Sequence, residues 1–233
     1  MKRFRDYFER GVRGALLLSA AVSILSVVFI TVFILAEGLP LFFPPADGGD
    51  PPTITEFLFG TEWFPTESPP LYGILPFITG SLLVTAGALG LAVPVGISVG
   101  VFIAEIAKGK AQSVLRSTTE ILAGIPSVVY GFFGVMMIGF FLRTFRNPVV
   151  NYNAFSAMVI LAVMTLPTII NITEVSLRAV PRPYKDGSLA LGSTDWQMIW
   201  RVQMPAARGG IITGVILGMG RAVGETMAVL MVA

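Results

Sequence analysis

Long uncharged stretches alternate with short charged segments along the whole chain. Four uncharged runs reach the roughly 20 residues that a membrane-spanning helix needs, and they cover residues 15–36, 71–104, 121–142 and 147–173. A fifth apolar segment, 209–233, is interrupted only by Arg221 and Glu225. The pattern predicts five membrane-spanning helices.

Local signals refine the second and third of these helices. The second run has 34 residues, about 51 Å as a helix, so it is too long for one upright span. We expect it to begin with a surface segment, with Pro76 and Gly80 as candidate break points. Ser117 and Glu120 have capping-box spacing, which predicts the start of the third helix there, and Pro126 is expected to kink it.

The composition agrees with a membrane protein. Hydrophobic residues make up 54% of the chain and charged residues only 13%, about half the charged fraction of an ordinary soluble domain. We therefore predict an all-α, polytopic membrane helix bundle. The chain contains no histidine and no cysteine, which excludes imidazole catalysis, disulfides and the usual zinc and iron–sulfur sites. We expect this chain to bind no metal and no cofactor.

The basic residues predict the orientation in the membrane. Thirteen of the 16 precede the first span, join spans two and three, or join spans four and five, and the positive-inside rule places these segments in the cytoplasm. Residues 1–14 are then cytoplasmic, and the loop 37–70, with six acidic and no basic residues, is extracytoplasmic. That loop holds eight of the 16 prolines, which predicts an ordered but irregular cap. Arg143 and Arg146 are exceptions on the outer side.

Arg221 and Glu225 are the candidate functional residues in the last segment. Arg221 lies 12 residues after Gly209, about 18 Å along a helix, which places it near the bilayer midplane. A central arginine costs about 2.5–3.5 kcal/mol and usually faces a partner or a water-filled pathway. Glu225 follows at i, i+4 spacing, on the same helix face. The pair is either a neutral structural link or a cation placed for an anion, and we favour the second interpretation.

The same segment carries two sets of small residues at four-residue spacing. Gly210, Gly214 and Gly218 form one set, and Gly220 with Gly224 forms the other. Small residues allow helix backbones to approach closely in lipid. This helix is therefore expected at the centre of the bundle or against a second subunit.

The cytoplasmic segment 184–208 is amphipathic and predicts two short helices joined at Gly192. Asp186 suits a helix N-terminus, and Thr194 with Gln197 has capping-box spacing for a second helix that ends before Pro205. The two helices present Leu189, Leu191, Trp196, Ile199 and Trp200. These side chains lie either at the membrane interface or in a groove of a partner protein.

From about Gly73 to the end, the chain resembles the permease subunits of binding-protein-dependent ABC importers. The segment Lys185–Gly192, followed by Val202–Pro205, is similar to the EAA loop of that family, although Asp186, Gly187 and Ser188 replace its Glu-Ala-Ala. The resemblance implies the type I importer permease (MetI-like) fold over 71–233, with Asp186, Gly187, Ser188, Gly192 and Pro205 in coupling helices. It also favours a protein partner for these helices, the ATP-hydrolysing subunit.

Within that family, the chain resembles the phosphate permeases of the PstC branch. The matching segments are 92–96, 122–131 and above all 218–229. This resemblance implies that Arg221 and Glu225 lie on a phosphate pathway. It further implies a second, PstA-like permease, a dimer of the PstB-like ATP-binding subunit and an extracytoplasmic PstS-like phosphate-binding protein, and no nucleic acid partner.

The expected function is therefore phosphate import across the cytoplasmic membrane of a prokaryote. We expect a non-catalytic subunit, because the chain has no GxxxxGK[ST] loop, and ATP and Mg²⁺ would belong to the partner. Family members usually have six spans, so we expect a fragment that lacks the last one. The alternatives are a permease for sulfate or molybdate, or a membrane scaffold or sensor that transports nothing. An intramembrane protease is disfavoured because no histidine is present and all five aspartates lie outside the predicted spans.

Overall fold

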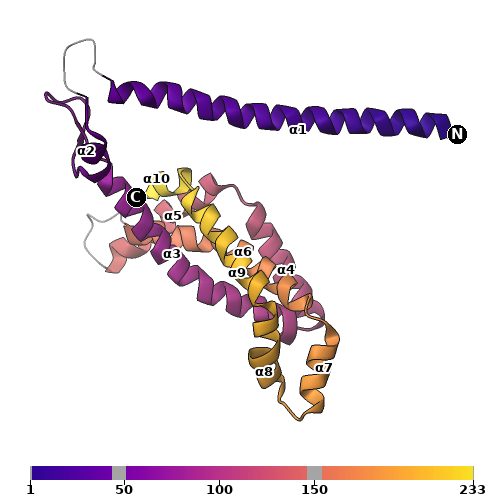
Figure 1. Ribbon diagram of the computed structural model, residues 1–233. Helices are drawn as coiled ribbons and strands as arrows, with labels where there is room; N and C mark the ends of the chain where they lie inside the picture. The colour runs from indigo at the N-terminus through magenta and orange to yellow at the C-terminus, as the bar shows by residue number, and fades with distance from the viewer. Residues whose placement is uncertain (1, 44–50, 146–153, 233) are drawn as a thin grey trace. The chain divides into compact units, whose positions relative to one another are not determined.

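The computed structural model describes residues 2–43, 51–145 and 154–232 (Figure 1). By its internal contacts the chain divides into two compact units, Met1–Pro76 and Phe77–Ala233. Almost all regular structure in the described residues is helical, which confirms the predicted all-α class.

The first unit is built around one long helix. This helix, α1 (Lys2–Gly38), contains the predicted span 15–36 and is exposed at every position whose side chain is described. It is followed by a 3₁₀ turn, η1 (Leu39–Phe42), by α2 (Ile54–Phe59) and by the short antiparallel strands β1 (Trp63–Phe64) and β2 (Leu71–Tyr72). The loop predicted as an irregular cap thus contains a short helix and a two-stranded ribbon. Residues 2–14 are helical, as part of α1.

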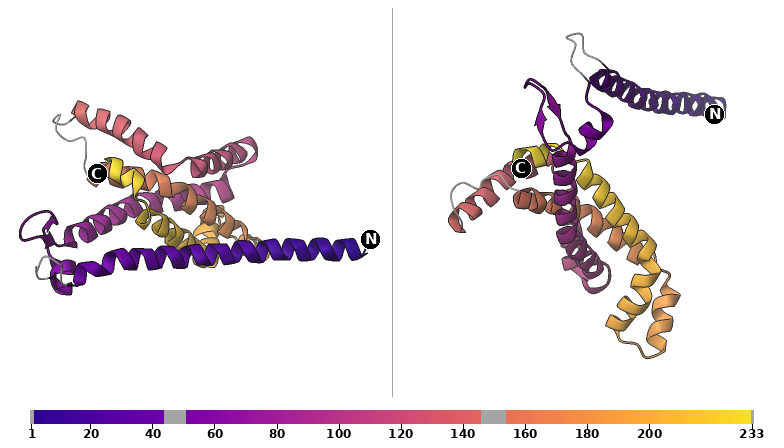
Figure 2. Two further views of the ribbon diagram at one scale, coloured as in Figure 1. Left: turned by 90° about the horizontal axis from the view of Figure 1, so that it is seen from above. Right: turned by 60° about the vertical axis from the view of Figure 1, so that its left-hand side comes forward.

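The second unit is a helix bundle. Its elements are α3 (Leu75–Val101), the π-helical turn η2 (Phe102–Ile106), α4 (Gly109–Gly124), α5 (Ser127–Phe145), α6 (Ala154–Arg178), α7 (Arg182–Ala190), α8 (Asp195–Met198), the π-helical turn η3 (Ile199–Gln203), α9 (Met204–Val223) and α10 (Met227–Val232). The hairpin formed by α7 and α8 lies at the opposite end of this unit from α10 (Figures 1 and 2). As predicted, the second uncharged run begins outside the helix, in β2; Pro76 lies in the first turn of α3, but Gly80 does not break it.

Helix α6 is the centre of the bundle. Its Ile169 is fully buried, and a Cβ atom on Gly96 of α3 or on Gly218 of α9 would meet that side chain at 2.8 and 2.9 Å. Gly210 and Gly214 likewise face Ser176 and Ile172 of α6. The tight packing predicted for the Gly210–Gly214–Gly218 face is therefore confirmed. The second set differs: a Cβ on Gly220 would meet nothing within 4 Å, and one on Gly224 would meet only neighbouring backbone.

This difference gives a matched pair of substitutions on one helix. Gly218→Ala is expected to destabilise the protein, since Ile169 is held by Gly96 on its other side and overpacking costs about 1–3 kcal/mol. Gly220→Ala adds the same methyl group to open space and gains about 0.5–1 kcal/mol of helix propensity. Thermal unfolding of the two variants in detergent tests this, and equal midpoints would contradict the packing.

The prediction that residues 121–142 form a single kinked helix is wrong. Helices α4 and α5 are separate and meet at an angle of 96° (Figure 2). Ile125 precedes Pro126 and has extended dihedrals, φ −70° and ψ 129°, because the proline ring disfavours the helical conformation of the residue before it. The predicted helix start at Ser117 is also wrong, since α4 begins at Gly109 and runs through Ser117.

The number of apolar helices can be compared with the five predicted spans. Within the described residues, three helices are long and apolar enough to cross a membrane: 9–42, 75–106 and 154–178. The bent pair of α4 and α5 makes a fourth if it counts as one span. Helix α9 is not among them; it begins five residues before the predicted Gly209 and contains Arg208 and Arg221. Arg146 and the predicted start of span four, 147–153, lie outside the described residues.

Candidate functional site

Arg221 and Glu225 lie on different elements. Arg221 is in the last turn of α9, which ends at Val223 with Gly224 as its C-cap, a position where a cation interacts favourably with the helix dipole. Glu225 follows the helix, and its Oε1 accepts a hydrogen bond from the backbone N–H of Ala228 in α10 at 3.0 Å. The predicted i, i+4 pair is therefore wrong: the helix stops at a glycine before Glu225, whose carboxylate instead caps the next helix.

The guanidinium of Arg221 is left without a carboxylate partner in the described part of the chain. Both Arg221 and Glu225 are half-buried. The side chain of Tyr130 in α5 is close enough to Arg221 for the arginine charge to act on its phenol group. Arg221 is thus a partly buried cation at the end of α9, and the element that follows it, α10, packs against α5.

Tyr130 also connects the two arms of the α4–α5 break. Its hydroxyl donates a hydrogen bond to the carbonyl of Leu122 in α4 at 2.8 Å. The backbone around Pro126 leaves carbonyls that need such a partner. Sequence reasoning missed this residue, although it lies in the segment 122–131 that resembles the phosphate permeases.

Tyr130→Phe is expected to lower the free energy of unfolding by about 1 kcal/mol, because the Leu122 carbonyl loses its side-chain donor and keeps only the backbone N–H of Ile125 at 3.3 Å. Tyr184→Phe is the control, since this tyrosine is 58% exposed and therefore has water available to its hydroxyl. Denaturant or thermal unfolding of the two variants provides the comparison. A Tyr130→Phe protein as stable as Tyr184→Phe would show that the hydrogen bond does not hold the break.

The α7–α8 hairpin (residues 182–198) contains most of the predicted coupling residues. Asp186 and Gly187 are exposed in the middle of α7, so Asp186 does not mark a helix N-terminus as predicted; α7 starts at Arg182, after Pro181. Gly192 makes the turn with φ +83°, a conformation that glycine adopts readily. The hydroxyls of Ser188 and Ser193 are 2.7 Å apart across this turn.

The second half of the segment is helical throughout. Thr194 and Gln197 form the predicted capping box of α8. The helix does not end before Pro205, however, because η3 continues from α8 into α9 and Pro205 lies in the first turn of α9.

One face of the hairpin is apolar and exposed. Leu191 is 91% exposed and Trp196 is 59% exposed, and the rings of Trp196 and Trp200 pack edge to face with centroids 5.7 Å apart. The prediction that Ile199 belongs to this face is wrong, since Ile199 is buried with Val101 and Leu177 in the core. An exposed face of this kind is typical of a surface that a partner covers.

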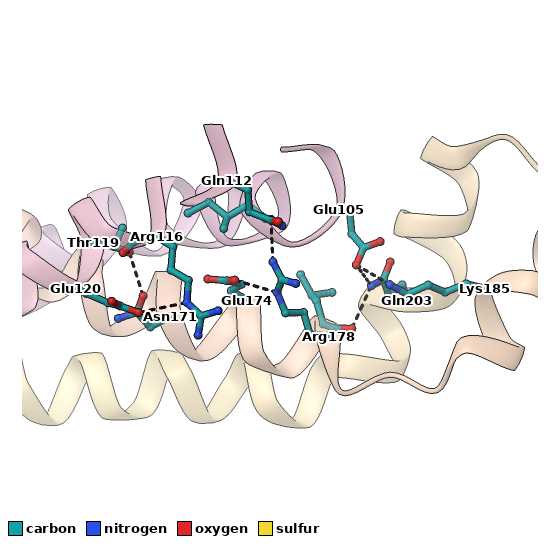
Figure 3. Close-up of polar contacts among 12 residues, drawn as sticks. Glu105, Gln112, Arg116, Thr119, Glu120, Asn171, Glu174, Arg178, Lys185 and Gln203 are labelled. Carbon is teal, nitrogen blue, oxygen red and sulfur yellow. Dashed lines mark hydrogen bonds and ion pairs between the residues drawn. The ribbon is translucent and has the colours of Figure 1, made fainter. Parts of the chain in front are cut away.

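Polar contacts at the hairpin end of the bundle join η2, α4, α6, α7 and η3 (Figure 3). Glu174 and Arg178 form an i, i+4 ion pair on α6, with Nε and Oε1 2.9 Å apart and the glutamate buried. Thr119 and Asn171 join α4 to α6. Glu105 and Gln203, which sequence reasoning missed, are hydrogen-bonded to each other. A signal for Glu105 existed, because it is the first charge after the 34-residue uncharged run.

Among the described residues, no group of three or more histidine, cysteine, aspartate and glutamate side chains is arranged to hold a metal ion. Two candidate sites remain: Arg221 in the last turn of α9, whose charge acts on Tyr130 of α5, and the apolar hairpin that precedes α9. This arrangement suits the binding of an anion and the docking of another protein.

Comparison with known proteins gives the family. Residues 96–233, more than half of the chain, match the family described as binding-protein-dependent transport system inner membrane component. The probable ABC transporter permease protein YqgH of Bacillus subtilis is 41% identical over 223 residues, which cover 95% of this chain and 71% of the relative.

Several further relatives are named as phosphate permeases. The phosphate transport system permease protein PstC of Xylella fastidiosa is 32% identical over 243 residues, covering 96% of this chain and 71% of the relative. PstC 1 of Mycobacterium tuberculosis is 38% identical over 180 residues, covering 69% of this chain and 53% of the relative. The predicted resemblance is thereby confirmed: the chain belongs to the binding-protein-dependent transport system inner membrane components and is a multi-pass, PstC-like permease of an ABC importer.

Proposed function

We propose that this permease imports inorganic phosphate and that Arg221 contacts the anion on its way through the membrane. The observation that carries the proposal is the position of Arg221, a half-buried cation at the end of α9 with no carboxylate partner among the described residues. A guanidinium presents its N–H groups as a planar fork that fits two phosphate oxygens at once. The names of the relatives support the choice of phosphate.

Glu225 contributes to this site by shaping it. Its carboxylate is engaged at the start of α10, so it leaves the charge of Arg221 available to an anion. A carboxylate directly on Arg221 would compete with phosphate for the same N–H groups. The hydroxyl of Tyr130 lies within the field of that charge, but its one proton is donated to the Leu122 carbonyl, so the N–H donors for phosphate come from Arg221.

The remaining parts of the importer come from other chains in this proposal. A second permease completes the pathway, a dimer of ATP-binding subunits docks on the α7–α8 hairpin, and an extracytoplasmic binding protein delivers phosphate. This chain itself catalyses no reaction and binds no cofactor. The N-terminus and the hairpin lie in the cytoplasm, as the distribution of basic residues favours.

Anion competition in cells that depend on this transporter tests the choice of substrate. Uptake of labelled phosphate should persist in excess sulfate or molybdate and should be lost in excess unlabelled phosphate. Inhibition by sulfate or molybdate at equal concentration would favour a permease for another oxyanion. An assembled complex that takes up none of the three would point to a scaffold or sensor.

A further inference from the structure

One carboxylate oxygen holds both ends of the segment that contains the hairpin. Oε1 of Glu105 in η2 accepts hydrogen bonds from Nζ of Lys185 at 2.6 Å and from Nε2 of Gln203 at 2.5 Å (Figure 3). Lys185 lies in the first half of α7, and Gln203 is the last residue of η3. The same oxygen therefore joins the start of the hairpin to the start of α9, and Met198 and Ile199 between them pack into the core.

The surroundings make this contact specific. The side chain of Glu105 is 10% exposed and that of Lys185 is 23% exposed, so water screens the ion pair only partly. Gln203 is fully buried, and its amide nitrogen also donates to the carbonyl of Leu177 at 3.1 Å. Both neighbours of that nitrogen are acceptors, which determines the orientation of the amide.

The backbone on both sides of the contact is irregular in the same way. Glu105 lies in the π-helical turn η2, and Gln203 lies in the π-helical turn η3. Single π turns inside α-helices occur frequently at functional sites. Here they follow α3 and precede α9, the two helices whose glycines pack against Ile169 of α6.

The two helices of the hairpin differ in their attachment to the bundle: Met198 of α8 is buried in the core with Val101 and Leu177, whereas α7 is attached weakly. Helix α7 buries none of its side chains, and it packs against α8 and η3. Gln203, in contrast, directly precedes Met204, the first residue of α9, and Arg221 lies in the last turn of the same helix. The helix between Gln203 and Arg221 is about 27 Å long, and we expect it to move as one body. A displacement at Gln203 therefore reaches Arg221.

We propose that Glu105 is the positioning residue that transmits movement of the α7–α8 hairpin to α3 and α9. When a partner moves the hairpin, the Lys185–Glu105–Gln203 contact makes both ends of the segment move together with the end of α3. The proposal rests on the proposed function in one respect, that an ATPase docks on the hairpin. Glu105 contacts neither substrate nor ATP.

The test uses the whole complex purified with its partner subunits. Glu105→Gln keeps an oxygen acceptor but removes the charge that holds Lys185. Glu120→Gln is the control, because Glu120 pairs with Arg116 in α4 with both side chains more than half exposed. Glu105→Lys with Lys185→Glu exchanges the charges and keeps the ion pair, but Gln203 must turn its otherwise unpartnered oxygen to residue 105 and give up its bond to the Leu177 carbonyl.

The first readout is the number of ATP molecules hydrolysed per phosphate transported in proteoliposomes. Glu105→Gln should raise this ratio about tenfold, within the range of ordinary coupling energies, while Glu120→Gln stays near the wild-type ratio. The charge exchange should give a ratio between the two, because it restores the ion pair but not the Gln203–Leu177 bond. A merely structural role would lower both activities together and leave the ratio unchanged. That result would overturn the proposal.

A second readout does not depend on the substrate. The natural chain has no cysteine, so Val223→Cys at the end of α9, where Val223 is 66% exposed, provides a single site for maleimide labelling. ATP with vanadate should change the labelling rate in the wild-type background but not with Glu105→Gln. The same change in both backgrounds would overturn the proposal. A complex that transports no phosphate contradicts the proposed function, and the labelling still decides the role of Glu105.

Discussion

Replacing Arg221 with glutamine is expected to reduce phosphate uptake more than about 100-fold, because two charge-assisted hydrogen bonds contribute roughly 1.5–3 kcal/mol each. Glutamine is uncharged and cannot form the two parallel N–H contacts of a guanidinium. The complex should still assemble, since Arg221 has no ion-pair partner among the described residues and lies in the last turn of its helix. Uptake of labelled phosphate and co-purification of the partner subunits measure the two effects separately.

Arg116→Gln provides the matched control for this variant. It removes the same charge from an exposed pair with Glu120, and surface pairs of this kind contribute about 0–1 kcal/mol. Its uptake should remain close to that of the wild type. Undiminished uptake in Arg221→Gln would remove Arg221 from the phosphate pathway, whereas equal losses in both variants would indicate a general effect of charge.

Leu191→Glu is expected to prevent the ATP-binding subunit from joining the complex. Leu191 is 91% exposed at the turn of the hairpin, and burial of a leucine side chain against a partner contributes about 1.5–3 kcal/mol. A glutamate loses this contribution and adds the cost of moving a charge out of water. We expect co-purification of the ATP-binding subunit to fall more than about 30-fold, the sum of the two effects.

Ile54→Glu is the control for this second substitution. Ile54 is 65% exposed at the start of α2, in the first unit, far along the chain from the hairpin. Both substitutions place the same charge on an exposed apolar position, so a general effect on folding or insertion would appear in both. Normal recovery of the ATP-binding subunit with Leu191→Glu would contradict the docking of that subunit on the hairpin.

The long apolar helices were predictable because their pattern is local. An uncharged run of 22 residues defines 15–36, and neighbouring structure cannot change its length or polarity. The turn at Gly192 and the capping box at Thr194 likewise depend on residues within one helical turn. A close helix–helix contact at Gly218 was predictable, since small residues repeat at helical spacing.

Helix ends and long-range contacts were harder to predict from the sequence. The i, i+4 interpretation of Arg221 and Glu225 assumed a continuous helix, whereas Gly224 ends α9 and Glu225 caps α10. Pro126 indicated a kink, but the angle of the break depends on contacts such as Tyr130 to Leu122. Glu105 and Gln203 are 98 residues apart in the chain, and no local pattern connects them.

The most direct test of the central claim is phosphate accumulation by the purified complex in proteoliposomes. The complex would contain this chain, its co-purified subunits and the phosphate-loaded binding protein, with ATP supplied on the side of the ATP-binding subunits. We predict that labelled phosphate enters the vesicles only when ATP and the binding protein are both present, and that sulfate does not replace it. ATP hydrolysis without phosphate accumulation, or equal accumulation of sulfate, would contradict phosphate import by this permease.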